Sequence, residues 1–177
     1  QPHGLYTNLV PDKNDPYVIS GICGQCHESI VTKYPNGSST WNSSEVSDLS
    51  VGACISEIRC THCHNPHKSS APREAFPANP EHIRACVRCH ESYQDSDFAR
   101  KHTKHSNAAE VSCLDCHMPA YSMDLERIVR SHTISSPTDS RMYNAAAPNA
   151  CGLCHLDKSI AWILNSLKEQ WGVEIER

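Results

Sequence analysis

Five copies of one short motif give this chain its strongest chemical signal. Each copy reads Cys-x-x-Cys-His, and together the five use ten of the eleven cysteines among 177 residues. So many copies in so short a chain far exceed what chance would produce, which indicates that the motif carries the function. The cysteine pairs are Cys23 and Cys26, Cys60 and Cys63, Cys86 and Cys89, Cys113 and Cys116, and Cys151 and Cys154.

The spacing within the motif suits covalent attachment of haem c. Two residues between the cysteines let a single helical turn present both thiols to the haem, where each forms a thioether with a vinyl-derived carbon. The histidine after the second cysteine then points its imidazole at the iron as the proximal ligand. We therefore predict five haem c groups whose proximal ligands are His27, His64, His90, His117 and His155.

Other uses of paired cysteines explain less of the pattern. A structural zinc site needs two such pairs, or one pair and distant histidines, and five pairs would leave one over. A disulfide framework gives no reason for a histidine after every second cysteine, and a thioredoxin-like redox motif would occur once, near a βαβ pattern. Cys54 lies outside the motifs, so it is either a buried free thiol or a partner in an intermolecular disulfide.

The remaining histidines are numerous enough to bind every iron from its second side. Seven of them remain for five irons, so none of the three methionines is needed as a thioether ligand. We expect bis-His, six-coordinate, low-spin haems, whose potentials are lower than a Met ligand would give. His62 lies between two motif cysteines and could serve only a neighbouring haem. The predicted second ligands are His3, His67, His82, His102, His105 and His132.

Position along the chain distinguishes these candidates. His67 follows His64 by three residues, too close to flank the same iron easily, so it would tie two haems together. His102 and His105 also lie three residues apart, on one expected helix, and compete with each other. His3 lies on an N-terminal arm, where it is either a ligand, within the chain or to the next subunit of a stack, or part of a loose terminus.

The composition supports an interior filled by cofactors. Leu, Ile, Val and Phe make up only 31 of 177 residues, a fraction at which disorder is normally suspected. A formal net charge of −4 and eleven cysteines do not fit a disordered chain, whereas large flat apolar groups in the core would account for the deficit. The sequence contains no basic stripe that would suit nucleic acid and no apolar run long enough to span a bilayer.

The fold is expected to be mainly α-helical with much irregular loop, organised around a chain of covalently bound haems. Apolar residues recur at three- and four-residue steps near the C-terminus, and Gly172 ends that pattern. A compact domain of this length has a radius of gyration of about 16 Å, so five haems would lie near edge contact. We predict one domain over 1–177, an arm over about 1–20, a polar loop over 35–50, helical structure from about 81 to 104, no β-sheet, and a helix over about 157–171.

Several longer pieces of sequence, spread from Cys60 to about Trp171, resemble those of a known family. They are Cys-Thr-His-Cys-His-Asn-Pro-His67, Cys-Leu-Asp-Cys-His117-Met-Pro, Arg-Ser-His132-Thr-Ile-Ser-Ser-Pro and Pro-Asn-Ala-Cys151-Gly-Leu-Cys-His155-Leu-Asp-Lys-Ser. In these pieces the chain resembles multihaem cytochromes c related to nitrite reductase and hydroxylamine oxidoreductase. The resemblance implies stacked and T-shaped haem pairs in a mostly helical, loop-rich fold, together with export and haem attachment outside the cytoplasm.

One departure from that family and one further likeness bear on function. The nitrite reductases carry a catalytic haem with a Lys proximal ligand and an open distal side, whereas all five motifs here end in His. The hydroxylamine oxidoreductases need a haem crosslinked to Tyr, which a sequence cannot show. The start, Pro-His3-Gly-Leu-Tyr, is similar to the beginnings of some cytochromes that polymerise into extracellular filaments, in which a His of one subunit ligates a haem in the next.

These patterns favour an electron carrier over an enzyme. We expect an exported protein, periplasmic or extracellular, that exchanges electrons with redox partner proteins or an extracellular acceptor. Self-association into a conductive filament is one form of this function, and a soluble periplasmic shuttle is the other. The alternative from another class is a small multihaem reductase with one open iron site, acting on a nitrogen or sulfur compound.

Overall fold

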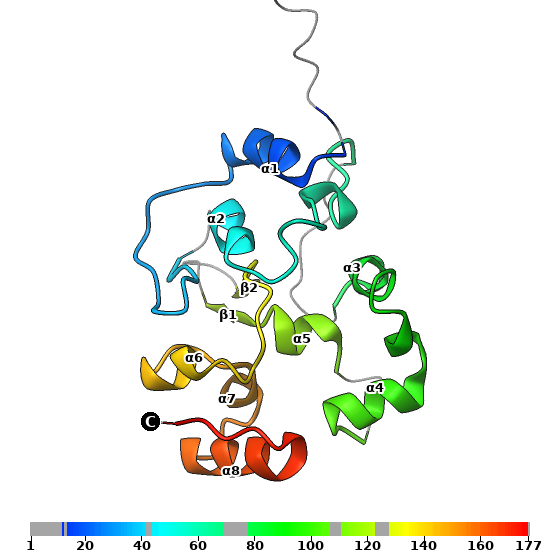
Figure 1. Cartoon of the computed structure of the whole chain (residues 1–177). Coiled ribbons are helices and arrows are strands. Elements are labelled where there is room, and N and C mark those ends of the chain that lie inside the picture. Colours follow the sequence, from blue (N-terminus) through cyan, green and yellow to red (C-terminus); the bar gives the residue numbers. More distant parts are fainter. Residues whose placement is uncertain are drawn as a thin grey trace, which may run out of the picture.

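Short helices joined by loops make up most of the computed structural model (Figure 1). The structure describes residues 12, 14–41, 44–68, 78–106, 111–122 and 128–176. The predicted fold class, mainly α with much irregular loop, is confirmed. The α-helices are α1 (Pro16–Gly24), α2 (Glu45–Ser50), α3 (Pro80–Val87), α4 (Ser96–Thr103), α5 (Cys113–His117), α6 (Ser140–Asn144), α7 (Ala150–Cys154) and α8 (Ile160–Trp171), with 3-10 turns η1 (Cys60–His62) and η2 (Glu91–Gln94).

The helices begin where short polar side chains cap them. Such a side chain accepts a hydrogen bond from a backbone N–H of the first turn, which has no partner within the helix. Proline at the first helical position of α1 and α3 is compatible with these starts because its missing N–H would be unpaired there. The capping residues are Asp15, Asn79, Asp95, Asp139, Asn149 and Ser159.

The last helix, α8, closes the end of the molecule opposite α1 (Figure 1). It ends at Trp171, and Gly172 takes the left-handed conformation (φ 68°) that ends many helices. Its apolar face buries Ile163 and Leu167, which are 1% and 3% exposed. The predicted end is confirmed, and so are Ile163 and Leu167 of the predicted apolar face, whereas Ile160 and Trp171 are exposed. The helix starts at Ile160 instead of about Asp157 because Ser159 is its cap.

The stretch predicted to be helical from about 81 to 104 is broken into three elements. Helix α3 ends at Val87, η2 follows His90, and α4 begins only after its cap Asp95. Lys104 has a left-handed backbone (φ 58°), which ends α4 before His105. Most of the stretch is therefore helical, as predicted, but in three separate elements.

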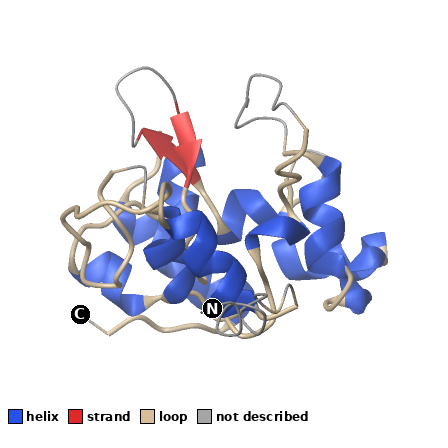
Figure 2. Cartoon of the chain, turned by 90° about the horizontal axis from the view of Figure 1, so that it is seen from above, coloured by secondary structure: helices blue, strands red, loops and turns tan. Residues whose placement is uncertain are grey.

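A small antiparallel hairpin contradicts the prediction of no β-sheet. Strands β1 (Ala120–Ser122) and β2 (Ile128–Arg130) pair with Tyr121 opposite Val129. Figure 2 shows this hairpin in red beside the helices. Strands of three residues are too short to show the alternation by which a strand is recognised in a sequence.

The segment predicted as a polar loop over 35–50 is partly helical and partly buried. Helix α2 occupies its end, and Asp48 on that helix is 3% exposed. Its carboxylate accepts hydrogen bonds from the amide and hydroxyl of Ser39, at 2.8 and 2.5 Å, and lies 3.5 Å from the ammonium of Lys33. A buried hydrogen-bonded cluster of polar residues has the same composition as a surface loop, which explains the error.

Helix α1 begins at Pro16 and so occupies the end of the stretch predicted as an N-terminal arm over about 1–20. The earlier part of the arm, including His3, lies largely outside the described residues. In the described part of the chain, no helix has both the length and the apolar character needed to cross a membrane.

The polypeptide has little apolar core of its own. The buried hydrophobic residues lie near α2 and in the C-terminal half. Between Ala53 and Cys113 none of the described residues is buried, although α3, η2 and α4 lie in this stretch. A helix is normally held in a protein by burying one face, so these elements need something other than side chains to pack on. The buried hydrophobic side chains among the described residues are Leu49, Leu114, Met142, Ala150, Ile163 and Leu167.

Candidate haem-binding sites

Every motif forms the helical turn that haem attachment requires. In the first motif the amide of His27 donates to the carbonyl of Cys23 at 2.9 Å, and the second, third and fifth motifs repeat this bond at 2.9, 3.1 and 2.8 Å. The fourth motif is the whole of α5, which Ser112 and Asp115 cap reciprocally. The predicted helical turn between the paired cysteines is therefore present in all five copies.

Consecutive motifs lie next to one another in space. Helix α1 packs against η1, α3 against α5, and α5 against α7. Burial, followed by the nearby thiols of Cys113, Cys63 and Cys54, raises the pKa of the Cys86 thiol to about 11. Burial likewise raises the pKa of Cys116 to about 11, with Cys151 as the next cause.

The first and second motifs are joined in the same way. Burial raises the pKa of Cys23, and the Cys60 thiol raises it further through its charge and a side-chain hydrogen bond. The motifs thus form a continuous series in chain order, from α1 through η1, α3 and α5 to α7. Figure 1 shows the same progression, with α1 and α8 at opposite ends and α5 between them.

Three pairs of histidine rings face each other at one characteristic distance. The ring centroids lie 6.2 Å apart in His64 and His132, 6.1 Å in His102 and His117, and 6.2 Å in His105 and His155. Two imidazoles bound to opposite sides of one metal ion, with metal–nitrogen bonds of about 2 Å, have ring centres roughly 6 Å apart. Each pair joins one motif histidine with one predicted second ligand, so each could hold a haem iron between its rings.

Backbone carbonyls orient two of these rings. The Nδ1 atom of His117 lies 2.8 Å from the carbonyl oxygen of Ser135, and Nδ1 of His105 lies 2.7 Å from that of Thr103. A ring nitrogen that donates to a carbonyl fixes the tautomer and leaves the other nitrogen, Nε2, as a lone-pair donor. These hydrogen bonds prepare both rings to coordinate metal through Nε2.

His102 and His105 have different ring partners, although the sequence predicts that they compete on one helix. His102 lies in the last turn of α4 and faces His117, whereas His105 follows the left-handed residue Lys104 and faces His155. The change of backbone direction at Lys104 separates two side chains that would share one face of a continuous helix. One short segment therefore contributes to two different sites.

The first and third motif histidines have different neighbours. His27 is 58% exposed, and its Nδ1 atom lies 3.8 Å from a carboxylate oxygen of Glu45. The ring of His90 meets the edge of Tyr93, with centroids 6.1 Å apart. Among the described residues, neither His27 nor His90 has an imidazole ring facing it.

Among the described residues, the remaining predicted ligands His67 and His82 form no such pair with a motif histidine. His67 is exposed in the turn after the second motif. The ring of His82 lies 5.4 Å from that of His64 and is tilted by 59°, closer than an intervening metal ion would allow. His3 lies outside the described residues.

The surroundings of the motifs also fit a large apolar group. Around the fifth motif, Leu156 is 82% exposed and Ile160 and Trp162 are also exposed, although Trp162 has its ring centroid 5.0 Å from that of His155. Exposed apolar side chains grouped in this way normally mark a surface that something covers. Haem beside each motif would cover such side chains and supply the core that the stretch from Ala53 to Cys113 lacks.

The alternative uses of the cysteines find no support in the structure. All eleven cysteines are described, and none is in a disulfide. Within the described ranges, no three His, Cys, Asp or Glu side chains come together as a metal-binding group, which a structural zinc site would need. Cys54 is a half-buried free thiol beside Cys86.

Several supporting residues were missed by the sequence reasoning. Trp162 contacts the ring of His155, and Tyr93 contacts the rings of both His90 and His102. The indole N–H of Trp171 donates to the carbonyl of His102 at 2.7 Å. For Trp162, its place directly after the fifth motif was a usable signal. The contact of Trp171 joins distant parts of the sequence and had none.

Comparisons with known proteins agree with the assignment of these motifs to haem c attachment. The model of the cytochrome c552 family matches residues 94–172, and that of the doubled CXXCH motif matches residues 53–95. The multiheme cytochrome MtrA of Shewanella baltica (strain OS185) is 24% identical over 139 residues, which cover 78% of this chain and 32% of that protein. The chain thus spans about a third of the length of this relative, and no solved structure matches it. With its repeated haem-attachment turns, its facing histidine rings and these matches, the chain is a multihaem c-type cytochrome.

Proposed function

We propose that this cytochrome binds five haems in one domain and carries electrons along them without catalysing a reaction of its own. The observation that carries the proposal is the set of three histidine ring pairs at 6.1–6.2 Å, each containing one motif histidine. When bound, haem c supplies a reversible one-electron iron couple. The polypeptide has to hold each iron from both sides and keep neighbouring sites close.

The ligands we propose for three irons follow the ring pairs. His64 and His132 bind one iron, His102 and His117 a second, and His105 and His155 a third. With both axial positions taken by imidazole, no substrate has an open position at these irons, which favours a carrier over a reductase. For the irons at His27 and His90, the second ligands come from His3, His67 and His82.

The arrangement of the motifs supports a path for electrons. Thioether anchors at neighbouring cysteines would hold each haem close to the next, since Cys23 adjoins Cys60, Cys63 and Cys113 adjoin Cys86, and Cys116 adjoins Cys151. The path would run from the first motif near α1 to the fifth beside α8. Its two ends are the natural places for exchange with redox partner proteins or an extracellular acceptor.

We also propose that the protein is exported and that copies associate into an extracellular filament. The exposed imidazole of His27 supports this idea, because among the described residues it has no imidazole facing it. A histidine of another copy, His3 first of all, would complete that site. Electron microscopy of the native material tests the filament: ordered fibres are expected, and dispersed single molecules would leave the soluble periplasmic shuttle as the form of the function.

Electron paramagnetic resonance of the ferric protein tests the proposed coordination. We expect only low-spin signals, since every iron would have two imidazole ligands. A high-spin signal from about one iron in five would instead favour the small reductase with an open site. His62→Ala is a matched control, because His62 has no place in any proposed pair and its loss should leave the spectrum unchanged.

A further inference from the structure

Two segments that carry ligands of different sites are joined along their length. The hairpin of β1 and β2 is extended by a hydrogen bond from the amide of Ser131 to the carbonyl of Pro119, at 3.0 Å. Further along, the amide of Ser135 donates to the carbonyl of His117 at 3.1 Å, and Nδ1 of His117 lies 2.8 Å from the carbonyl oxygen of Ser135. His132 lies between these connections, so its backbone is fixed relative to that of His117.

An ion pair lies at the start of this junction. A guanidinium nitrogen of Arg130, Nη2, is 2.6 Å from Oδ1 of Asp115, and its other terminal nitrogen, Nη1, donates to the carbonyl of Met118 at 3.1 Å. The side chains of Arg130 and Asp115 are only 12% and 14% exposed. A pair so shielded from water is screened much less than one on the surface, and leaving one charge without its partner is costly.

Asp115 is also built into the haem-attachment turn. It stands between Cys113 and Cys116, and its second oxygen, Oδ2, accepts hydrogen bonds from the amide and hydroxyl of Ser112, at 2.8 and 2.7 Å. One carboxylate thus caps α5 and holds Arg130 at the end of β2. Any displacement of Arg130 is passed to α5, which ends at His117, and to His132 two residues further along.

We propose that the Asp115–Arg130 ion pair is a positioning element that couples the ligand geometry of two haem sites. This inference rests on the proposed pairing, in which His117 faces His102 and His132 faces His64. The two sites therefore share this ion pair, here called the clamp (Asp115 and Arg130), although they share no ligand. The site of His105 and His155 has no residue in the clamp and serves as the internal reference.

The relative orientation of the two imidazole planes provides the readout. The planes differ by 13° in the pair His102–His117 and by 28° in the pair His64–His132. In low-spin ferric haem this angle governs the electron paramagnetic resonance g-values, so a rotated ligand ring shifts a signal even where the fold and the haem count are intact. Single variants His102→Met, His132→Met and His105→Met assign the three signals beforehand, because each alters one site.

The test compares Arg130→Gln and Arg130→Lys in the haem-loaded protein. Arg130→Gln removes the charge and should shift both coupled signals while the His105–His155 signal stays in place. Arg130→Lys keeps the charge but not the two-pronged contact, so it should restore part of the shift. Asp115→Asn, which keeps an oxygen for Ser112, should shift the same two signals and gives a second route if Arg130→Gln folds poorly.

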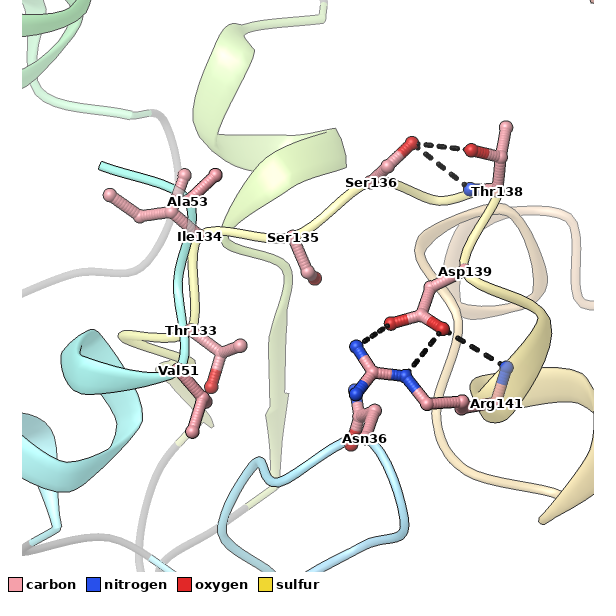
Figure 3. A pocket seen from close by; sticks show the side chains of 10 residues that line it. All are labelled: Asn36, Val51, Ala53, Thr133, Ile134, Ser135, Ser136, Thr138, Asp139 and Arg141. Atoms are coloured by element: carbon pink, nitrogen blue, oxygen red, sulfur yellow. Dashed lines mark hydrogen bonds and ion pairs between the residues drawn. The ribbon is translucent and has the colours of Figure 1, made fainter. Parts of the chain in front are cut away.

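Arg141→Gln is the matched control. Figure 3 shows Arg141 paired with Asp139 at the start of α6, close to the segment from Thr133 to Ser136. That arginine is 61% exposed, and its pair with Asp139 includes no ligand, so all signals should be unchanged.

If wild-type protein gives its low-spin signals and Arg130→Gln moves neither or only one of the coupled two, the clamp is overturned while the proposed function stands. Equal displacement of all signals would mean general loss of structure and would also overturn it; absence of low-spin signals in the wild type would overturn the proposed function itself.

Discussion

The rings of His102 and His117 face each other with their centroids 6.1 Å apart and their planes 13° from parallel. His117 follows a pair of motif cysteines, whereas His102 comes from the end of a helix that precedes that motif. The spacing is that of two imidazoles on one metal ion, and it arises in the polypeptide alone. Side chains and backbone thus place both imidazoles at this spacing.

Removal of either histidine near the end of α4 should open one site. His102→Ala should convert about one iron in five to high spin by leaving His117 as the sole imidazole at its iron, and His105→Ala should do the same at His155. The double variant should open two sites, since the two residues face different partners. Electron paramagnetic resonance of the three variants checks this, and a double variant no worse than either single one would show that both histidines serve the same iron.

The two kinds of cysteine should differ in their effect on haem content. Cys54→Ser should leave five haems attached, because Cys54 belongs to no motif even though it lies close to Cys86. Cys116→Ser removes one thioether of the fourth motif and should weaken or abolish attachment of one haem. Intact mass under denaturing conditions measures both, and loss of a haem in Cys54→Ser would assign this thiol a role in attachment.

The hydrogen bond between α8 and the end of α4 should contribute modestly to stability. Trp171→Phe keeps most of the aromatic surface but removes the indole N–H that donates to the His102 carbonyl at 2.7 Å. We expect the free energy of unfolding to fall by about 1 kcal/mol, the usual net value of such a bond. Denaturant titration measures it, with Trp41→Phe as the control; equal losses in both variants would show that the bond contributes nothing specific.

Burial of Tyr121 makes stability depend on alkaline pH. Desolvation raises the pKa of its phenol from 10.0 to about 12, with smaller effects from Ser131, Asp48 and Tyr34. The pKa of Tyr121 is higher in the folded than in the unfolded protein. The contribution of this tyrosine to the free energy of unfolding is therefore complete below pH 10 and is lost as the pH rises from there through about 12. Tyr121→Phe should therefore flatten the fall in unfolding free energy over this range. Parallel pH profiles of the variant and the wild type would contradict the prediction.

The haem-attachment turns were readable from sequence because their chemistry is local. Five consecutive residues carry both thiols and the proximal imidazole, so spacing alone identifies Cys113, Cys116 and His117 as a unit. The C-terminal helix was also readable, because the positions of Ile163 and Leu167 repeat with the helical period and Gly172 ends the pattern.

The pairing of the second ligands was not readable, because it depends on contacts between distant segments. His132 meets His64 from a distant part of the sequence, just after the hairpin and the junction of Arg130 with Asp115. The split between His102 and His105 depends on the left-handed backbone of Lys104, a residue that seldom adopts it, so the sequence favoured one continuous helix.

The intact mass of the protein, purified from a host with working cytochrome maturation and measured under denaturing conditions, tests the central claim most directly. Thioether bonds survive denaturation, so we predict a single species whose mass exceeds that of the polypeptide by five haem groups. A mass equal to that of the bare chain, or one short of five haems in fully matured material, would contradict the account.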